Sequence, residues 1–260
     1  MGLELHPLAR GFTDVADDYE RGRPGYSPEV VDAIRRALDL ADGARVADVG
    51  AGTGKLTRAL AAGGFDVVAV EPLAGLRDRL RAELQGIEAL DGTAEALPLA
   101  DASDDAVVCA DAFHWFDGPR AVAELARVIR PDGGLALLWN LEGEWDDPPP
   151  WQPELQALVE GIRPEHPSFT GDQGRGAVVD SPAFGELALT EVRRVHETDP
   201  ERLLAQIASM SYVGGLPPAR RDDVLRRAEA ILDRHGAGEV AVPLRTTIWT
   251  TRRLVLRGSS

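Results

Sequence analysis

The residues best suited to binding a ligand form a glycine-rich turn, Asp48-Val49-Gly50-Ala51-Gly52-Thr53-Gly54. The apolar run Arg45–Val49 predicts a strand ahead of the turn, and leucines at helical spacing predict a helix behind it. Glycines at such a place let the backbone approach a ligand closely, and the N–H groups of the new helix face that ligand. The turn therefore predicts a site for a nucleotide-like molecule.

The spacing of the glycines discriminates between nucleotides. A dinucleotide fingerprint needs its third glycine three places after the second, so that the helix can pack under a pyrophosphate. Lys55 stands at that place, and we recognise no hydride-transfer site elsewhere in the sequence. A dinucleotide-dependent oxidoreductase is therefore the less favoured alternative.

A second carboxylate stands at the end of the next expected strand, Asp66–Val70. Glu71 follows the turn at an offset of about twenty residues, where an acidic side chain accepts hydrogen bonds from both ribose hydroxyls of a nucleotide. A solvated carboxylate at a strand end is the alternative interpretation. The offset favours the ribose ligand.

Three later segments complete a series: Gly92-Thr93-Ala94-Glu95-Ala96-Leu97-Pro98, Ala110-Asp111-Ala112-Phe113-His114-Trp115-Phe116-Asp117 and Arg130-Pro131-Asp132-Gly133-Gly134. With the turn, they resemble the class I S-adenosylmethionine-dependent methyltransferases, in the small-molecule branch that includes trans-aconitate methyltransferase. The lead-in Phe12-x-x-Val15-Ala16-x-x-Tyr19-x-x-x-Arg23-Pro24-x-Tyr26 resembles the same branch. The resemblance implies S-adenosylmethionine as the cofactor and is closest from Phe12 to Asn140.

The resemblance also assigns cofactor contacts residue by residue. Tyr19 and Arg23 are expected at the methionine carboxylate, for which a guanidinium offers a two-pronged donor. The alternative for Arg23 is an ion pair with an acidic neighbour such as Asp18. Ala94 and Glu95 are expected at the edge of the adenine, and the alternative for Glu95 is a capping role. The expected cofactor ligands are Tyr19, Arg23, Asp48, Gly50, Gly52, Thr53, Gly54, Glu71, Pro72, Ala94, Glu95 and Ala110.

The loop after the fourth expected strand resembles the loop that faces the methyl donor and the acceptor in this branch. His114 has the pKa range of a general base, and the alternative is that it orders the loop or contacts the cofactor. Phe113, Trp115 and Tyr212 are expected to bind the acceptor together with His114, while Asp111 departs from the glutamine usual in the branch. Further candidates beneath a lid are Trp145, Trp151, His166, Met210 and Trp249.

Methyl transfer is an in-line displacement at a carbon activated by a sulfonium, so the protein must align the partners and exclude water. A base is needed only if the acceptor loses a proton. We expect O-methylation of a carboxylate or hydroxyl, with C-methylation as a less favoured outcome. Because fold and cofactor do not fix chemistry, an S-adenosylmethionine-binding protein that catalyses a non-methyl reaction remains an alternative.

The composition of the chain limits the kinds of molecule that it is expected to bind. The chain has a formal net charge of −15 and a pI near 4.8, which disfavours nucleic acid and anionic membranes. A small-molecule or short peptide-like acceptor is favoured, for a monomer or homodimer. The lone Cys109 cannot form an internal disulfide, scattered histidines give no metal spacing, and no apolar stretch or leader-like start is found. We therefore expect a cytoplasmic protein without metal.

Strand-like and helix-like segments alternate from Ser27 to Asn140, which indicates a parallel sheet covered on both faces. The expected fold is a Rossmann-like, doubly wound α/β sheet of seven strands, mostly parallel with an antiparallel last strand. We expect a turn at Pro131–Gly134. The predicted parts are an N-terminal helical segment over the cofactor (1–40), a cofactor-binding core (41–140), a lid (141–185) and a C-terminal part that completes the sheet with inserted helices (186–257).

Overall fold

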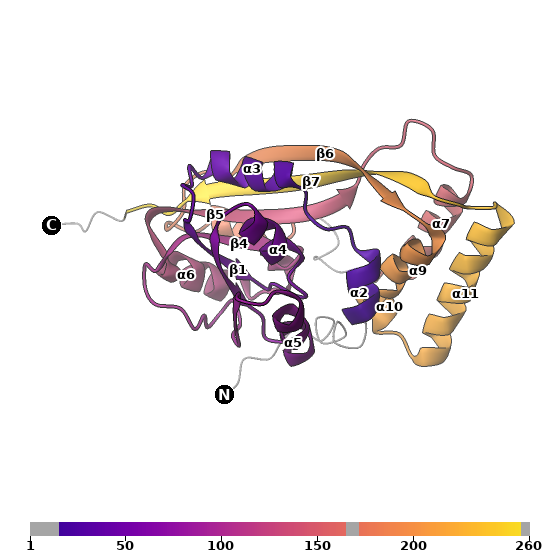
Figure 1. Cartoon of the computed structure of the whole chain (residues 1–260), viewed down its shortest axis with the longest axis horizontal. Helices are drawn as coiled ribbons and strands as arrows, with labels where there is room; N and C mark the ends of the chain where they lie inside the picture. The colour runs from indigo at the N-terminus through magenta and orange to yellow at the C-terminus, as the bar shows by residue number, and fades with distance from the viewer. Residues whose placement is uncertain (1–15, 165–171, 256–260) are drawn as a thin grey trace.

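The computed structural model describes residues 16–164 and 172–255. It shows a twisted sheet with helices on both faces and a group of helices beyond one end of the sheet (Figure 1). Phe12 and Val15 of the lead-in, and the lid candidate His166, lie outside the described residues.

The seven strands have the order β3-β2-β1-β4-β5-β7-β6. All neighbouring pairs are parallel except those of β7, which is antiparallel to both β5 and β6. This confirms the predicted fold class. The strands are β1 (Arg45–Val49), β2 (Asp66–Val70), β3 (Glu88–Leu90), β4 (Asp104–Ala110), β5 (Ile129–Glu142), β6 (Ala188–Thr198) and β7 (Val240–Arg252).

The described helices alternate with the strands up to β5 and then gather around β6 and β7. They are α2 (Ala16–Gly22), α3 (Pro28–Ala37), α4 (Lys55–Ala62), α5 (Ala74–Glu83), the 3-10 turn η2 (Phe113–Trp115), α6 (Gly118–Val128), α7 (Trp151–Glu160), α8 (Gly176–Val179), α9 (Pro200–Ala208), α10 (Ser211–Gly214) and α11 (Pro218–Arg234). Among the residues described, none of these helices combines the length and apolarity needed to cross a membrane.

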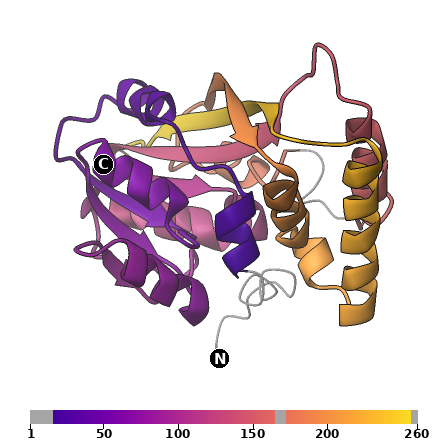
Figure 2. The ribbon, with the colours of Figure 1, turned by 45° about the vertical axis from the view of Figure 1, so that its right-hand side comes forward.

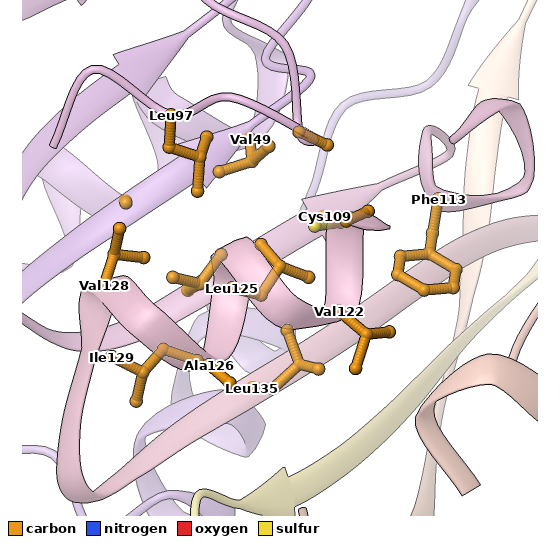
Figure 3. Packing of buried hydrophobic residues seen from close by; sticks show 14 of the residues in the cluster. Val49, Leu97, Cys109, Phe113, Val122, Leu125, Ala126, Val128, Ile129 and Leu135 are labelled. Carbon is orange, nitrogen blue, oxygen red and sulfur yellow. The ribbon is translucent and has the colours of Figure 1, made fainter. Parts of the chain in front are cut away.

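Successive residues of the central strands enter two different cores, because side chains alternate between the faces of a sheet. Val46 and Val108 face the cluster built with α3 and α4, whereas Ala47 and Val107 face the cluster built with α6. The apolar face of α6 packs into the second cluster (Figure 3). Both faces of the sheet are therefore shielded from water, which allows apolar residues along the whole length of the central strands.

A helical cap forms beyond one end of the sheet from α7, α9, α10 and α11 (Figure 2). The cap has its own apolar cluster, which includes Trp151, Leu155, Leu203, Ile207 and Leu232. The short helix α2 lies against α9 so closely that a Cβ on Gly22 would stand 2.1 Å from the Gln206 nitrogen. Helix α2 therefore belongs structurally to the cap.

The predicted parts differ from the structure in how the lid is assembled. The apolar face of α7 packs against α11, which is inserted between β6 and β7, whereas α8 packs on α6. A cap made of both sequence regions arises because α7 alone cannot bury its apolar face. The turn expected at Pro131–Gly134 lies within β5 as an irregularity of the strand. The pairing to β4 passes from Asp104–Ile129 to Ala106–Gly134, and Asp132 has a positive φ of 62°.

Candidate functional site

A cavity of about 1060 Å³ opens where the parallel strands end, beside the glycine turn between β1 and α4. Its wall combines the turn, the ends of β2 and β4, helix α2 and the cap. From the expected cofactor ligands it brings together Tyr19, Arg23, Asp48, Gly50, Gly52, Thr53, Glu71, Pro72, Ala94, Glu95 and Ala110. From the expected acceptor residues it contains His114, Trp115 and Tyr212.

The three glycines of the turn have positive φ angles but different surroundings. A Cβ on Gly50 would lie 2.7 Å from the Ala112 Cβ, and one on Gly54 would lie 2.9 Å from the Leu80 Cγ. A Cβ on Gly52 would meet no described atom within 4 Å. Gly52 is therefore the glycine that leaves room for a ligand, and Gly54 is corrected to a packing position between α4 and α5.

Glu71 is 5% exposed and holds the turn from the end of β2. Its Oε2 accepts a hydrogen bond from the Gly52 backbone N–H, and its Oε1 accepts one from the Leu73 N–H, each at 2.9 Å. Burial raises the pKa of the carboxyl. Each carboxylate oxygen has a second acceptor position, which suits a pair of ribose hydroxyls.

Asp48 is a buried carboxylate at the end of β1, only 1% exposed. Its Oδ2 accepts a 2.6 Å hydrogen bond from the Thr57 hydroxyl, while its Oδ1 has no hydrogen-bond partner among the described residues. Burial raises the pKa of Asp48 to about 7. Because an unpaired buried oxygen is costly, this atom fits a ligand that brings a cationic or hydrogen-bonding group.

Helix α2 is fastened to the glycine turn through Glu20. The Thr53 hydroxyl donates to Glu20 Oε2 at 2.7 Å, and the Lys55 ammonium donates to the Glu20 carbonyl at 2.8 Å. Tyr19 precedes Glu20 in α2, and Arg23 follows the end of this helix. The bonds of Glu20 therefore help to hold both residues in the cavity wall.

Arg23 donates from Nε to the Ser209 hydroxyl at 3.0 Å, which ties it to the cap. The expected alternative, an ion pair with Asp18, is absent from the described residues, where Asp18 instead pairs with Arg21 and Arg221. The two terminal nitrogens of Arg23 remain suitable for a carboxylate.

Ala94 and Glu95 lie in the cavity wall after β3. Glu95 Oε1 accepts a 2.8 Å hydrogen bond from the Asp117 N–H at the start of α6. The alternative capping role is thus present for one oxygen of Glu95.

His114 lines the cavity from η2, and its ring is held by the core. The Trp139 indole N–H donates to His114 Nδ1 at 3.1 Å. A neutral imidazole whose Nδ1 accepts carries its proton on Nε2. This tautomer favours His114 as a hydrogen-bond donor over His114 as a base.

Phe113 is a correction, because it is 1% exposed and belongs to the core cluster beside Val122 (Figure 3). It does not line the cavity, so the adjacent positions 113 and 114 face in different directions. Tyr212 does line it and donates to the Met210 sulfur at 3.1 Å. Trp249 also lies outside the cavity wall and packs under the Arg175 guanidinium, 4.4 Å from its ring centroid.

The structure adds a group of polar residues that was not among the predicted ligands. Tyr26 donates its hydroxyl to Asp111 Oδ2 at 2.8 Å, and the Asn140 N–H donates to Asp111 Oδ1 at 3.3 Å. All three line the cavity, and burial raises the pKa of Asp111. The sequence did mark two of these residues, because Tyr26 belongs to the lead-in motif and Asp111 stands where the branch usually has glutamine. Neither feature indicated that the two side chains would form a hydrogen bond.

No group of three histidine, cysteine, aspartate or glutamate side chains in the described part of the chain is arranged to hold a metal. The cavity instead offers buried carboxylates and a glycine that admits close approach, which suit a nucleoside bearing an ammonium group. The sheet order and this donor set define a class I S-adenosylmethionine-dependent methyltransferase.

Comparison with known proteins agrees. Residues 47–137 match the methyltransferase domain family. Over 237 residues the chain is 39% identical to the uncharacterized methyltransferase Rv3342 of Mycobacterium tuberculosis, with 91% of each chain covered. The chain belongs to this methyltransferase family.

Solved structures show the same fold. A provisionally assigned type II methyltransferase of Anaeromyxobacter dehalogenans aligns with a TM-score of 0.65 and 23% identity, covering 89% of this chain and 97% of the other. The [4+2]-cyclase SpnF aligns with a TM-score of 0.51 and 19% identity, covering 90% and 85%. The fold is therefore shared with a protein named for a different reaction.

Proposed function

We propose that this methyltransferase transfers its methyl group to an oxygen of a small molecule, with a carboxylate as the favoured acceptor and a hydroxyl next. The observation that carries this choice is the hydrogen bond from Trp139 to His114 Nδ1. It leaves Nε2 as the protonated nitrogen, so His114 is suited to donate to an acceptor oxygen that is already anionic.

S-adenosylmethionine supplies a methyl group activated by a sulfonium, and the chain must hold an acceptor in line with it and exclude water. A carboxylate oxygen requires no base, because it loses no proton. Arg120 and Arg163 also line the cavity, whose wall carries several carboxylates as well, and these two guanidinium groups are the candidates to pair with a carboxylate acceptor. A hydroxyl acceptor would require a base, for which Asp111 and His114 are the nearest candidates in the wall.

The proposed cofactor contacts follow from the wall. Glu71 would hold the ribose hydroxyls, Arg23 and Tyr19 the methionine carboxylate, and Ala94 with Glu95 the adenine edge. The unpaired Oδ1 of Asp48 supports a contact to a donor group of the cofactor. Acceptor contacts are proposed for His114, Trp115 and Tyr212.

A methyl-transfer assay with a panel of acceptors tests the proposal. Protein is incubated with S-adenosylmethionine bearing a deuterated methyl group and with carboxylic acids, alcohols, phenols, amines and short peptides, and products are identified by mass spectrometry. Labelled methyl esters are expected. Labelled amines alone would contradict O-methylation, and a converted acceptor without label would favour the second candidate, a non-methyl reaction, which the SpnF fold makes worth testing.

We also propose a cytoplasmic protein that acts as a monomer or homodimer. The buried free thiol of Cys109 supports a reducing compartment. Size-exclusion chromatography with light scattering decides the oligomeric state.

A further inference from the structure

A second cavity, of about 140 Å³, lies beneath the cap and adjoins the main one. Several residues line both cavities, including Tyr26, Asn140 and Met210. The smaller one, here called the cap cavity, extends from this shared wall between α7, α9 and β7. The two cavities are therefore neighbours, and only these shared residues stand between the main cavity and the cap cavity.

Charged side chains line only the part of the cap cavity that adjoins the main cavity. Every charged residue described in its wall is also in the wall of the main cavity: Arg23, Lys55, Asp111 and Glu142. The deeper wall is made mainly of apolar side chains, including Trp145, Trp151, Leu155, Leu203, Ile207 and Val242. His196 is also there, and burial lowers its pKa, so the ring is neutral at neutral pH.

The two glutamine amides in the remaining wall lie toward solvent and are hydrogen-bonded to each other and to Glu142 and Glu160. Gln152 Nε2 donates to Glu142 Oε1 and to Gln156 Oε1, each at 3.1 Å, and Gln156 Nε2 donates to Glu160 Oε1 at 2.9 Å. The Trp145 indole N–H also donates to Glu142. An apolar occupant would leave these polar groups paired, so the cavity does not penalise it.

We infer that the cap cavity binds the apolar tail of the acceptor while the acceptor's oxygen lies in the main cavity. A cavity of about 150 Å³ lined by apolar side chains accommodates a benzene ring, so the tail has the size of one aromatic ring or about six carbons. The acceptor class is thus an amphipathic carboxylic acid with a compact apolar tail. This inference rests on the proposed function for the chemistry of the head group and on the cap cavity for the tail.

A series of straight-chain carboxylic acids from propanoic to decanoic acid tests it. Dissociation constants are measured by calorimetry with the whole chain saturated with S-adenosylhomocysteine. Affinity is expected to rise roughly four-fold per methylene until the cavity is filled, and then to level off. A dissociation constant independent of chain length, or no binding by any acid, would overturn the inference.

Matched variants locate the effect. Val242→Phe places a ring in the cap cavity from β7, whereas Val240→Phe makes the same change two residues away, outside both cavity walls. Val242→Phe is expected to abolish the gain with chain length, and Val240→Phe to keep it. Val159→Phe fills the same cavity from α7, so the result does not depend on β7 accepting a ring. An undiminished gain in a folded filled variant overturns the inference, and if neither filled variant folds the wild-type series decides.

Failure of the tail site and failure of the proposed function give different results. Alkan-1-ols and alkylamines of the same lengths are run beside the acids, and methyl products are sought with S-adenosylmethionine. Affinity that rises with chain length without any methyl ester would reject the carboxylate and retain the tail site. Esters formed equally well at every chain length would reject the tail site and retain the proposed function.

Discussion

Trp139 donates its indole N–H to Nδ1 of His114 across 3.1 Å, and so connects the buried core of β5 to the wall of the cavity. Trp139 is 2% exposed and lies under the Arg175 guanidinium, whose carbon stands 5.5 Å from its ring centroid. The indole is therefore held at its N–H by His114 and over its ring by Arg175, and its hydrogen bond fixes both the orientation and the tautomer of the imidazole.

The first prediction concerns this pair. His114→Ala is expected to raise the KM of the acid roughly tenfold or more, with the Kd of S-adenosylmethionine little changed, because a donor that holds the acceptor carboxylate is lost while no negative charge develops on its oxygen in the transition state. Trp139→Phe keeps the imidazole but removes its donor, and KM should rise less. Both are measured by steady-state kinetics on an acid found in the acceptor panel.

The pH dependence separates a donor from a base. A donor with its proton on Nε2 gives a flat kcat between about pH 6 and about pH 8 for a carboxylic acid acceptor. If kcat instead rose with one ionisation near neutrality, and this ionisation vanished in His114→Ala, His114 would be a base.

Glu71→Ala is expected to weaken S-adenosylmethionine by one to two orders of magnitude, since charge-assisted hydrogen bonds of about 1.5–3 kcal/mol are removed. Glu124→Ala is a matched control, because Glu124 also accepts a backbone N–H, from Leu97 at 3.0 Å, but lies outside the cavity wall. Calorimetry measures both. An unchanged Kd in Glu71→Ala would reject Glu71 as a ribose ligand.

Gly52→Val is expected to abolish cofactor binding by filling the space that its missing side chain leaves. Gly64→Val is the control, because Gly64 also has a positive φ, 86°, and no described atom within 4 Å of its virtual Cβ, but is absent from the cavity wall. Both variants place a β-branched residue at a positive φ, 59° at Gly52 and 86° at Gly64, so a binding defect confined to Gly52→Val points to the steric effect. Circular dichroism checks folding, and a folded Gly52→Val that binds normally would contradict the role.

The sequence predicted those parts of the site that depend on local order. Asp48 and Glu71 end apolar strands, and parallel strands bring their carboxyl ends to one edge, so their convergence followed from the pattern. Gly54 and Phe113 belong to matching motifs, but whether each side chain position faces a ligand or a neighbour depends on packing. Leu80 behind Gly54 and Val122 beside Phe113 come from later helices.

The cap shows where sequence patterns stop being informative. The apolar cluster of the cap brings Trp151 together with Leu203 and Leu232, although the strand β6 separates Trp151 from the other two in the chain. The apolar face of each cap helix would fit several partners equally well. The bond from Tyr26 to Asp111 likewise spans 85 residues. Non-local contacts of this kind have no periodicity, so the sequence indicated a lid without giving its walls.

The last prediction concerns Asp48, whose pKa burial raises from an ordinary value of 3.8 to about 7. A carboxyl with a raised folded-state pKa binds its proton more tightly in the folded than in the unfolded chain. Its contribution to stability is therefore present at about pH 4, declines as the pH rises toward about 7 and is constant above that. Asp48→Asn removes this penalty.

Without cofactor, Asp48→Asn is expected to exceed the wild type in free energy of unfolding at about pH 8, by up to about 4 kcal/mol for a shift of roughly three pKa units, and to show no such gain at about pH 4. Urea unfolding at the two pH values measures this. Burial also raises the pKa of Glu71 and Asp111. Asp111 is common to both proteins, whereas Glu71, whose charge helps to raise the pKa of Asp48, loses a like-charged neighbour in Asp48→Asn, which adds to the gain at about pH 8. The same variant should bind S-adenosylmethionine more weakly, because the carboxylate that stands unpaired at Oδ1 is lost. An equal difference in stability at both pH values would show that Asp48 is not held protonated by the fold, and undiminished cofactor affinity would show that the cofactor does not use the negative charge of Asp48.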